Sequence, residues 1–119
     1  MRYNSSMKEL ITIFKGASDP IRLRMIGLLL QHDELCVCDL MAALQLPQST
    51  TSRHLSYLRR CGWLTSRQEG LWRYYRLSSD FRSRYADLLV MLENRLNNAK
   101  TVIDSNTLLK EFVKTKMIC

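Results

Sequence analysis

Residues 38–60 read CDLMAALQLPQSTTSRHLSYLRR, and this segment indicates the fold most clearly. The first half predicts a short helix over about residues 38–44, because Leu40 and Leu44 lie one helical turn apart. After the connection Gln45–Pro47, the second half predicts a helix over residues 48–60. Its inward positions are Thr51, Leu55 and Leu58, and its outward positions are polar and basic. Two short helices joined by a tight turn in this way are typical of a helix-turn-helix.

Beyond this segment, the apolar residues no longer follow the period of a helix. Gly62 ends the second helix, and residues 63–68 and 71–77 are rich in aromatic side chains. Because Glu69-Gly70 separates these two runs, they predict a β-hairpin with glycine at its turn. A hairpin directly after a recognition helix is a wing. The predicted fold class is therefore mainly α with a β-hairpin, a winged helix-turn-helix that acts as a dimer.

Helices are predicted on both sides of this motif. An amphipathic helix covers about residues 6–15, and Asp19-Pro20 begins an apolar helix that ends near Gln31. Ser79-Asp80 begins a helix over Phe81–Leu96. Its apolar stripe consists of Tyr85, Leu88, Leu89, Leu92 and Leu96, and we interpret it as a dimer interface. Ser105 is expected to cap a last helix, so residues 1–98 form the DNA-binding and dimerisation domain and residues 99–119 a partly helical tail.

Length and charge narrow the functional class. The 119 residues are enough for one domain and too few for a large catalytic fold such as a TIM barrel. No apolar run is long enough to cross a bilayer, so we expect a soluble, cytoplasmic protein without a membrane partner. The net charge is +7, and residues 48–84 hold eight arginines against two acids. This concentration of arginine predicts binding to nucleic acid.

The recognition helix and the wing supply the expected DNA contacts. The first turns of such a helix enter the major groove, where Gln and Arg bind adenine and guanine edges. The candidates on the helix are Gln48, Ser49, Thr50, Ser52, Arg53 and His54. His54 could instead hold the helix against the turn. On the wing, Arg67 and Arg73 flank the tip and are candidates for the DNA backbone.

The cysteines complete a familiar pattern. Residues 34–40 read ELCVCDL, followed by QSTTSRHL at 48–55 and Tyr75-Arg76-Leu77 in the hairpin. Together these segments resemble the ArsR/SmtB family of winged-helix metalloregulators over about residues 7–96, and most of all its arsenic-responsive repressors. The resemblance implies that a homodimer represses an arsenic-resistance operon. It also implies that arsenite or antimonite releases the repressor from operator DNA by binding the thiolates of Cys36 and Cys38.

The chemistry supports that implication independently. Trivalent arsenic is thiophilic, so paired thiolates are its natural ligands. Residues two apart on a regular helix point about 200° apart, so Cys36 and Cys38 cannot share a helical face. Both sulfurs reach one atom only if the chain is non-helical at Cys36 or becomes so. We expect ligand binding to distort the start of the helix that supports the recognition helix.

The third ligand stays open. Several relatives carry another cysteine at the position of Met41, but a thioether binds trivalent arsenic weakly. Cys119 or Cys61 could complete a three-sulfur site, or solvent or a small thiol could do so. Cadmium sites of this family need cysteines near the N-terminus, and residues 1–16 have none. Zinc sites need histidines on the last dimer helix, whereas the two histidines here are His32 and His54.

Two other functions compete with this one. The same fold could sense thiol oxidation or another soft metal, again through its cysteines. A thiol enzyme is disfavoured, because the Cys-Val-Cys sequence lacks the two-residue spacer of redox motifs and no phosphate-binding loop is present. We therefore do not expect an enzyme.

Overall fold

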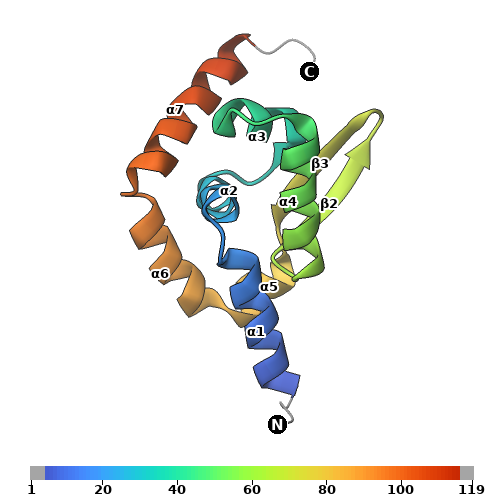
Figure 1. The fold of residues 1–119 in the computed structure, drawn as a ribbon, viewed down its shortest axis with the longest axis vertical. Helices are drawn as coiled ribbons and strands as arrows, with labels where there is room; N and C mark the ends of the chain where they lie inside the picture. Colours follow the sequence, from blue (N-terminus) through green and yellow to red (C-terminus); the bar gives the residue numbers. More distant parts are fainter. Residues whose placement is uncertain (1–4, 116–119) are drawn as a thin grey trace.

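The computed structural model describes residues 5–115, which form seven helices and three strands. The winged helix-turn-helix is confirmed, with α3 and α4 as its two helices and the β2–β3 hairpin as its wing (Figure 1). In chain order the elements are α1 (Ser5–Ala17), α2 (Pro20–Gln31), β1 (Leu35–Cys36), α3 (Val37–Leu44), α4 (Gln48–Arg60), β2 (Leu64–Glu69), β3 (Trp72–Leu77), α5 (Ser79–Arg84), α6 (Ala86–Leu96) and α7 (Lys100–Thr115).

Helix α2 lies at the centre of the molecule (Figure 1). As the sequence predicts, Asp19 is its N-cap and Pro20 its first residue, and the Asp19 carboxylate accepts hydrogen bonds from the backbone N–H groups of Ile21 and Arg22. The residues from Met25 to Leu29 are all buried. This central helix therefore supplies the surface on which the other helices pack.

The helix-turn-helix has the predicted boundaries to within one residue. Gln45 ends α3 with a left-handed backbone (φ 57°, ψ 48°), which turns the chain sharply towards α4. Thr51, Leu55 and Leu58 of α4 are completely buried. Because these side chains fix one face of α4 in the core, its other face is turned outward.

The wing is a regular antiparallel hairpin to which a third strand is added. Leu64 pairs with Leu77 and Glu69 with Trp72, so the loop consists of Gly70 and Leu71. Gly70 has a φ of 61°, a conformation that favours glycine. The two-residue strand β1 pairs with β3 and sets Cys36 opposite Tyr74. The sequence had not predicted this strand, which joins the cysteine segment to the wing.

Two expectations about the C-terminal half are wrong. The helix expected over Phe81–Leu96 is two helices, because the backbone leaves the helical region at Tyr85 (φ −125°, ψ 39°). Ser105 is not a cap: it lies inside α7 and donates a hydrogen bond to the carbonyl of Thr101. In the stripe interpreted as a dimer interface, Leu89 is buried and the other four side chains are half-buried against the core of their own chain, so the dimer interface stays a prediction.

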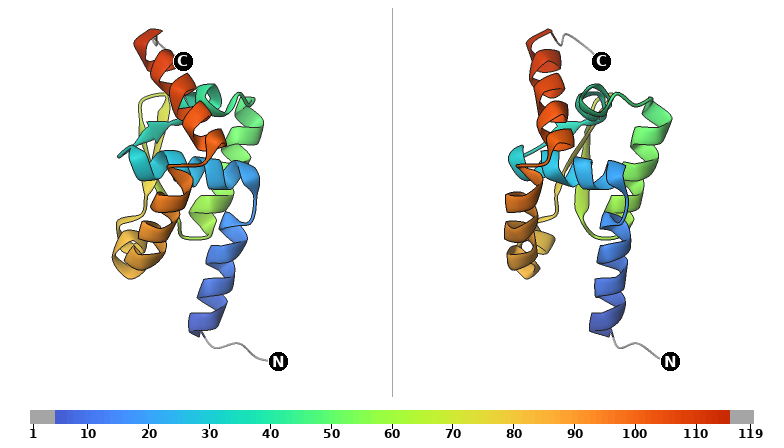
Figure 2. Two further views of the ribbon diagram at one scale, coloured as in Figure 1. Left: turned by 90° about the vertical axis from the view of Figure 1, so that its left-hand side faces the viewer. Right: turned by 60° about the vertical axis from the view of Figure 1, so that its left-hand side comes forward.

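Helix α7 returns along the molecule and packs against α2 and α3 (Figures 1 and 2). Gly27 of α2 makes room for it, because a Cβ atom there would lie 3.0 Å from a methyl group of Val102. On the same side Arg24 donates a hydrogen bond to Ser105 (3.1 Å), and His32 bonds to Asn106 (2.8 Å). None of the described helices is long and apolar enough to cross a membrane.

Candidate functional site

A cavity of about 580 Å³ lies at the start of α3. Its walls come from β1, α3, the turn before α4, the wing tip and α7. It is lined by Cys36, Val37, Cys38, Met41, Ala42, Gln45, Leu46, Gln48, Leu71, Trp72, Arg73 and Phe112. One space is therefore in contact with the two motif cysteines, the first residue of the recognition helix and the tip of the wing.

The two motif cysteines line this cavity from different kinds of backbone. Cys36 is the N-cap of α3 and is extended (φ −84°, ψ 166°), whereas Cys38 lies in the first turn of the helix. The backbone N–H of Cys36 donates to the Asp39 carboxylate at 2.9 Å. Since the chain is already non-helical at Cys36, both side chains can line one cavity without unwinding α3. The expected distortion of this helix is thus not required by the Cys-Val-Cys spacing.

The cysteines differ in their oxidation state. Cys38 is disulfide-bonded, whereas Cys36 and Cys61 carry thiols. Cys119, which the sequence offers as a third ligand, lies outside the described residues. Because a metalloid binds thiolates, Cys38 has to be reduced before it can act as a ligand.

Cys61 does not belong to this cavity. It follows the last residue of α4, whereas Gln48 at the first residue of the same helix lines the cavity. A helix rises 1.5 Å per residue, so the two ends lie roughly 18 Å apart. Burial also raises the pKa of the Cys61 thiol, which disfavours the thiolate. The suggestion of Cys61 as a third ligand beside Cys36 and Cys38 within one chain is therefore corrected.

No complete metal site is preformed in the part of the chain that the structure describes. No group of three or more His, Cys, Asp or Glu side chains there is arranged to hold a metal ion. A ligand at the cavity would therefore meet two sulfurs from the described residues, with its remaining positions filled from elsewhere.

The outer face of α4 carries most of the predicted DNA contacts. Gln48, Ser49 and Arg53 are exposed, and Thr50 and Ser52 are half-buried. All five lie in the first two turns of the helix, and Ser49, Thr50 and Arg53 point away from the buried Thr51 and Leu55. Their arrangement is compatible with insertion of this end of α4 into a DNA groove.

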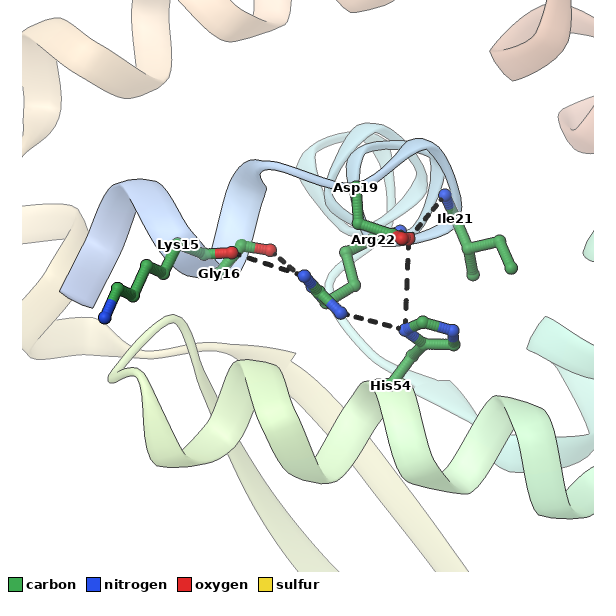
Figure 3. Close-up of polar contacts among 6 residues, drawn as sticks. All are labelled: Lys15, Gly16, Asp19, Ile21, Arg22 and His54. Atoms are coloured by element: carbon green, nitrogen blue, oxygen red, sulfur yellow. Dashed lines mark hydrogen bonds and ion pairs between the residues drawn. The ribbon is translucent and has the colours of Figure 1, made fainter. Parts of the chain in front are cut away.

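His54 is turned away from that outer face (Figure 3). Only 12% of its side chain is exposed, and its Nδ1 atom lies 3.1 Å from Arg22 and 3.9 Å from Asp19. Burial is the largest influence on this imidazole and lowers its pKa. His54 thus makes its polar contacts with the body of its own chain.

The two candidate arginines of the wing have different hydrogen-bond partners. Arg67 forms a two-pronged ion pair with Glu34 (2.7 and 2.8 Å) and also pairs with Glu69 at 2.8 Å. Its charge is compensated by these two carboxylates, and it lowers the pKa of Glu34. Arg73 instead donates to the neutral side chains of Ser66 and Gln68. Arg73 keeps its charge available to an external anion.

Sequence reasoning missed several residues of the site. Trp72 and Leu71 were part of the predicted hairpin, but only the pairing of β1 with β3 brings the hairpin beside the cysteines. Phe112 comes from α7, more than 70 residues further along the chain, and no local signal could place it here. Arg22, which binds His54, could not be identified either, because it lies in a helix whose sequence is mostly apolar.

The chain is similar to known regulatory proteins in sequence and in fold. Residues 19–66 match the family model of the bacterial regulatory proteins of the arsR family. The chain is 47% identical over 74 residues to the arsenic resistance transcriptional regulator ArsR1 of Pseudomonas putida. It is 48% identical over 68 residues to the arsenical resistance operon repressor of Escherichia coli. These matches cover 60% and 57% of this chain, and 58% of each relative. Among solved structures, HlyU of Vibrio cholerae is 30% identical with a TM-score of 0.64, over 77% of this chain and 92% of that one.

Proposed function

Because this chain belongs to the arsR family of bacterial regulatory proteins, we propose that it represses an arsenic-resistance operon and leaves its operator when arsenite or antimonite binds Cys36 and Cys38. As a member of a family of DNA-binding regulators it is not an enzyme. In this proposal it acts as a homodimer on double-stranded DNA in the cytoplasm.

One observation carries the proposal. The cavity that holds the two motif cysteines is also lined by Gln48, where the recognition helix begins, and by Trp72 and Arg73 of the wing. A ligand bound to the sulfurs therefore changes the packing between the two elements that approach DNA. Binding of arsenic at the two sulfurs would thus change the affinity of the protein for operator DNA. A ligand shifts the equilibrium between the DNA-bound and the free form only through contacts that differ between these two states.

The chemical step needs no oxidant or reductant once both thiols are reduced. Arsenous acid has three As–O bonds, and two of them break as two As–S bonds form. Each thiol proton leaves with a hydroxide as water. The third position keeps its hydroxyl group or takes a further thiol. Cys119 remains a candidate for that thiol.

The experiment uses the DNA duplex that the wild-type protein selects in vitro from a random-sequence pool, called here the operator duplex. Binding is followed by fluorescence anisotropy in excess phosphine reductant, which keeps thiols reduced without supplying any. Arsenite is expected to release the wild-type protein and the matched control Cys61→Ser, and to leave Cys36→Ser/Cys38→Ser bound. Release of the double variant, or retention of the reduced wild-type protein, would overturn the proposed inducer site.

The disulfide at Cys38 favours a second candidate function, the sensing of thiol oxidation. Here hydrogen peroxide takes two electrons and two protons from a pair of thiols, which forms one S–S bond and two molecules of water. The same titration separates the two functions. Peroxide without arsenite releases an oxidation sensor, and a phosphine reductant restores binding. Arsenite under reducing conditions releases a metalloid sensor.

We propose that Gln48, Ser49, Thr50, Ser52 and Arg53 contact DNA from α4, and that Arg73 contacts it from the wing. We expect Arg53→Ala to weaken binding to the operator duplex by about 1–3 kcal/mol, as for other arginines that bind base edges. Unchanged affinity at matched salt would remove Arg53 from the interface.

Substitution of two arginines of the wing gives a controlled comparison. Arg73→Ala is expected to reduce the slope of log affinity against log salt by about 0.9, the value for one lost phosphate contact. Arg67→Ala is expected to change this slope less, because Glu34 and Glu69 already compensate its charge. Equal slopes for both variants would contradict this assignment.

A further inference from the structure

The guanidinium group of Arg22 lies where three helices meet (Figure 3). Arg22 itself belongs to the first turn of α2. Its Nε atom donates to the carbonyl of Gly16 at 2.7 Å, and one of its terminal nitrogens donates to the carbonyl of Lys15 at 3.3 Å. Both carbonyls lie in the last turn of α1, where a helix leaves its carbonyls unpaired and favours a positive charge.

The other side of the same group contacts the recognition helix. The remaining terminal nitrogen lies 3.1 Å from Nδ1 of His54, and the guanidinium carbon lies 4.2 Å from the centre of the Tyr57 ring. His54 and Tyr57 are three residues apart in α4 and so are neighbours on one face. One side chain of α2 thus connects the end of α1 to the middle of α4.

Asp19 orders this cluster. Its carboxylate caps α2 by accepting from the backbone N–H of Arg22 at 3.1 Å, and it lies 3.9 Å from Nδ1 of His54. A guanidinium only donates, so the contact with Arg22 needs a neutral His54 with its proton on Nε2. The cluster therefore fixes one tautomer and one ring orientation of a residue in the recognition helix.

We propose that Arg22 is a positioning residue that sets the orientation of α4 relative to α1, and through it the affinity for operator DNA, without touching DNA. All three nitrogens of its guanidinium have partners within the chain, and its face stacks on Tyr57. An arginine used in this way is not available to a phosphate. The inference rests on the proposed DNA contacts of α4.

This orientation matters most when two recognition helices bind together. Helix α1 exposes Leu10 and Phe14, apolar side chains suited to a second copy of the chain. If two copies meet through α1, the angle between α1 and α4 sets the separation of the two recognition helices. That separation has to match the spacing of two DNA half-sites, about one helical turn of DNA.

The test compares Arg22→Met with Arg24→Met on the operator duplex. Arg24 is the matched control, because it lies two residues along in α2 and contacts Ser105 of α7 instead of α4. Arg22→Met is expected to weaken binding about tenfold, the usual size of one coupling between sites. Its salt slope is expected to stay within about 0.3 of the wild-type value, whereas a lost phosphate contact lowers it by about 0.9. Arg24→Met is expected to stay within about twofold of wild type, since its hydrogen bond runs to Ser105 of α7.

Three further measurements separate positioning from a general loss of folding. An operator duplex cut to one half-site is expected to show a smaller effect of Arg22→Met than the full duplex. His54→Asn keeps an acceptor near the position of Nδ1 and is expected to restore most of the affinity that His54→Leu loses. Adding Arg22→Met to His54→Leu is expected to cost little more, because both variants remove the same contact.

The outcomes distinguish this inference from the proposed function. Wild-type affinity in Arg22→Met, with Arg53→Ala impaired, would overturn the role of Arg22 and leave the DNA interface of α4 in place. Wild-type affinity in both variants would overturn both. A salt slope reduced by about 0.9 in Arg22→Met would make Arg22 a phosphate contact and also overturn the inference.

Discussion

At position 16, the space beside the buried Trp63 ring admits no more than a hydrogen atom. A Cβ atom on Gly16 would lie 2.9 Å from two atoms of that ring. The ring cannot move aside easily, because its Nε1 atom donates to the carbonyl of Ile13 at 2.9 Å and it stacks on Phe81. A glycine that looks like a helix interruption in the sequence is therefore a contact point between α1 and the core.

This contact reverses the effect that a glycine-to-alanine substitution in a helix usually has on stability. Alanine in place of glycine ordinarily stabilises a helix by about 1 kcal/mol. Gly16→Ala is instead expected to lower the free energy of unfolding by about 1–3 kcal/mol, the usual cost of overpacking a core. Urea denaturation followed by circular dichroism measures this difference. A stabilised variant would show that α1 does not pack against Trp63 as described.

His54 gives stability a pH dependence with a definite sign. Burial lowers the pKa of its imidazole in the folded chain, with Arg22 and Arg53 acting in the same direction and Asp19 opposing them. The stabilising effect of a neutral His54 is complete above the unfolded pKa of about 6.5 and is lost as the pH falls below it. The wild-type protein is expected to lose more stability between pH 7.5 and 5.5 than His54→Asn. The free energy of unfolding is measured by urea denaturation at the two pH values. An equal loss of this free energy in the wild-type protein and in His54→Asn would contradict the burial of His54.

At the scale of helices and strands, α7 is held by a small number of inward side chains. Val102, Ser105 and Leu109 are buried against α2 and α3, whereas Val113 is exposed. Leu109→Ala is expected to lower the free energy of unfolding by about 2–5 kcal/mol, as for other buried leucines. Val113→Ala, one turn further along, is expected to change it by less than about 0.5 kcal/mol. Similar effects of the two variants would mean that α7 is not docked in solution.

The sequence predicted those elements whose signals are local. Asp19-Pro20 marks a helix start, the buried positions of α4 follow the helical period, and Gly70 marks the hairpin turn. The break at Tyr85 has no glycine or proline to mark it, and it is accompanied by the ion pair of Arg84 with Glu9, which is a tertiary contact. Strand β1 is likewise two residues long and exists only through its pairing with β3.

The same distinction between local and tertiary signals applies to the residues of the candidate site. The Cys-Val-Cys motif and the outward face of α4 could be identified from residue types and spacing alone. The orientation of His54 could not, because Arg22 and Asp19 approach it from another helix. Similarly, the compensation of Arg67 by Glu34 depends on the strand register, and local patterns do not contain that register.

For the whole molecule, the proposed homodimer has to bring two recognition helices to one operator. Leu89 of the α6 stripe is buried, and the other four side chains of the stripe pack against the core of their own chain while staying half-buried. Helix α1 leaves Phe14 54% exposed and Leu10 41% exposed, and α6 leaves Val90 59% exposed. Figures 1 and 2 show α1 and α6 at the same end of the molecule, away from the wing tip. These helices are therefore the candidate dimer surface.

A charge placed on that surface should separate the two copies. Phe14→Arg is expected to convert a dimer to a monomer at micromolar concentration in sedimentation velocity, because a stable interface of about 800 Å² per partner does not tolerate an unpaired buried charge. Val113→Arg on α7 is the matched control and is expected to remain dimeric. The monomeric variant is expected to lose operator affinity while keeping its salt slope per half-site, since each recognition helix is unchanged. A wild-type monomer, or a dimeric Phe14→Arg, would exclude α1 from the interface and with it the route by which Arg22 sets the spacing of the two recognition helices.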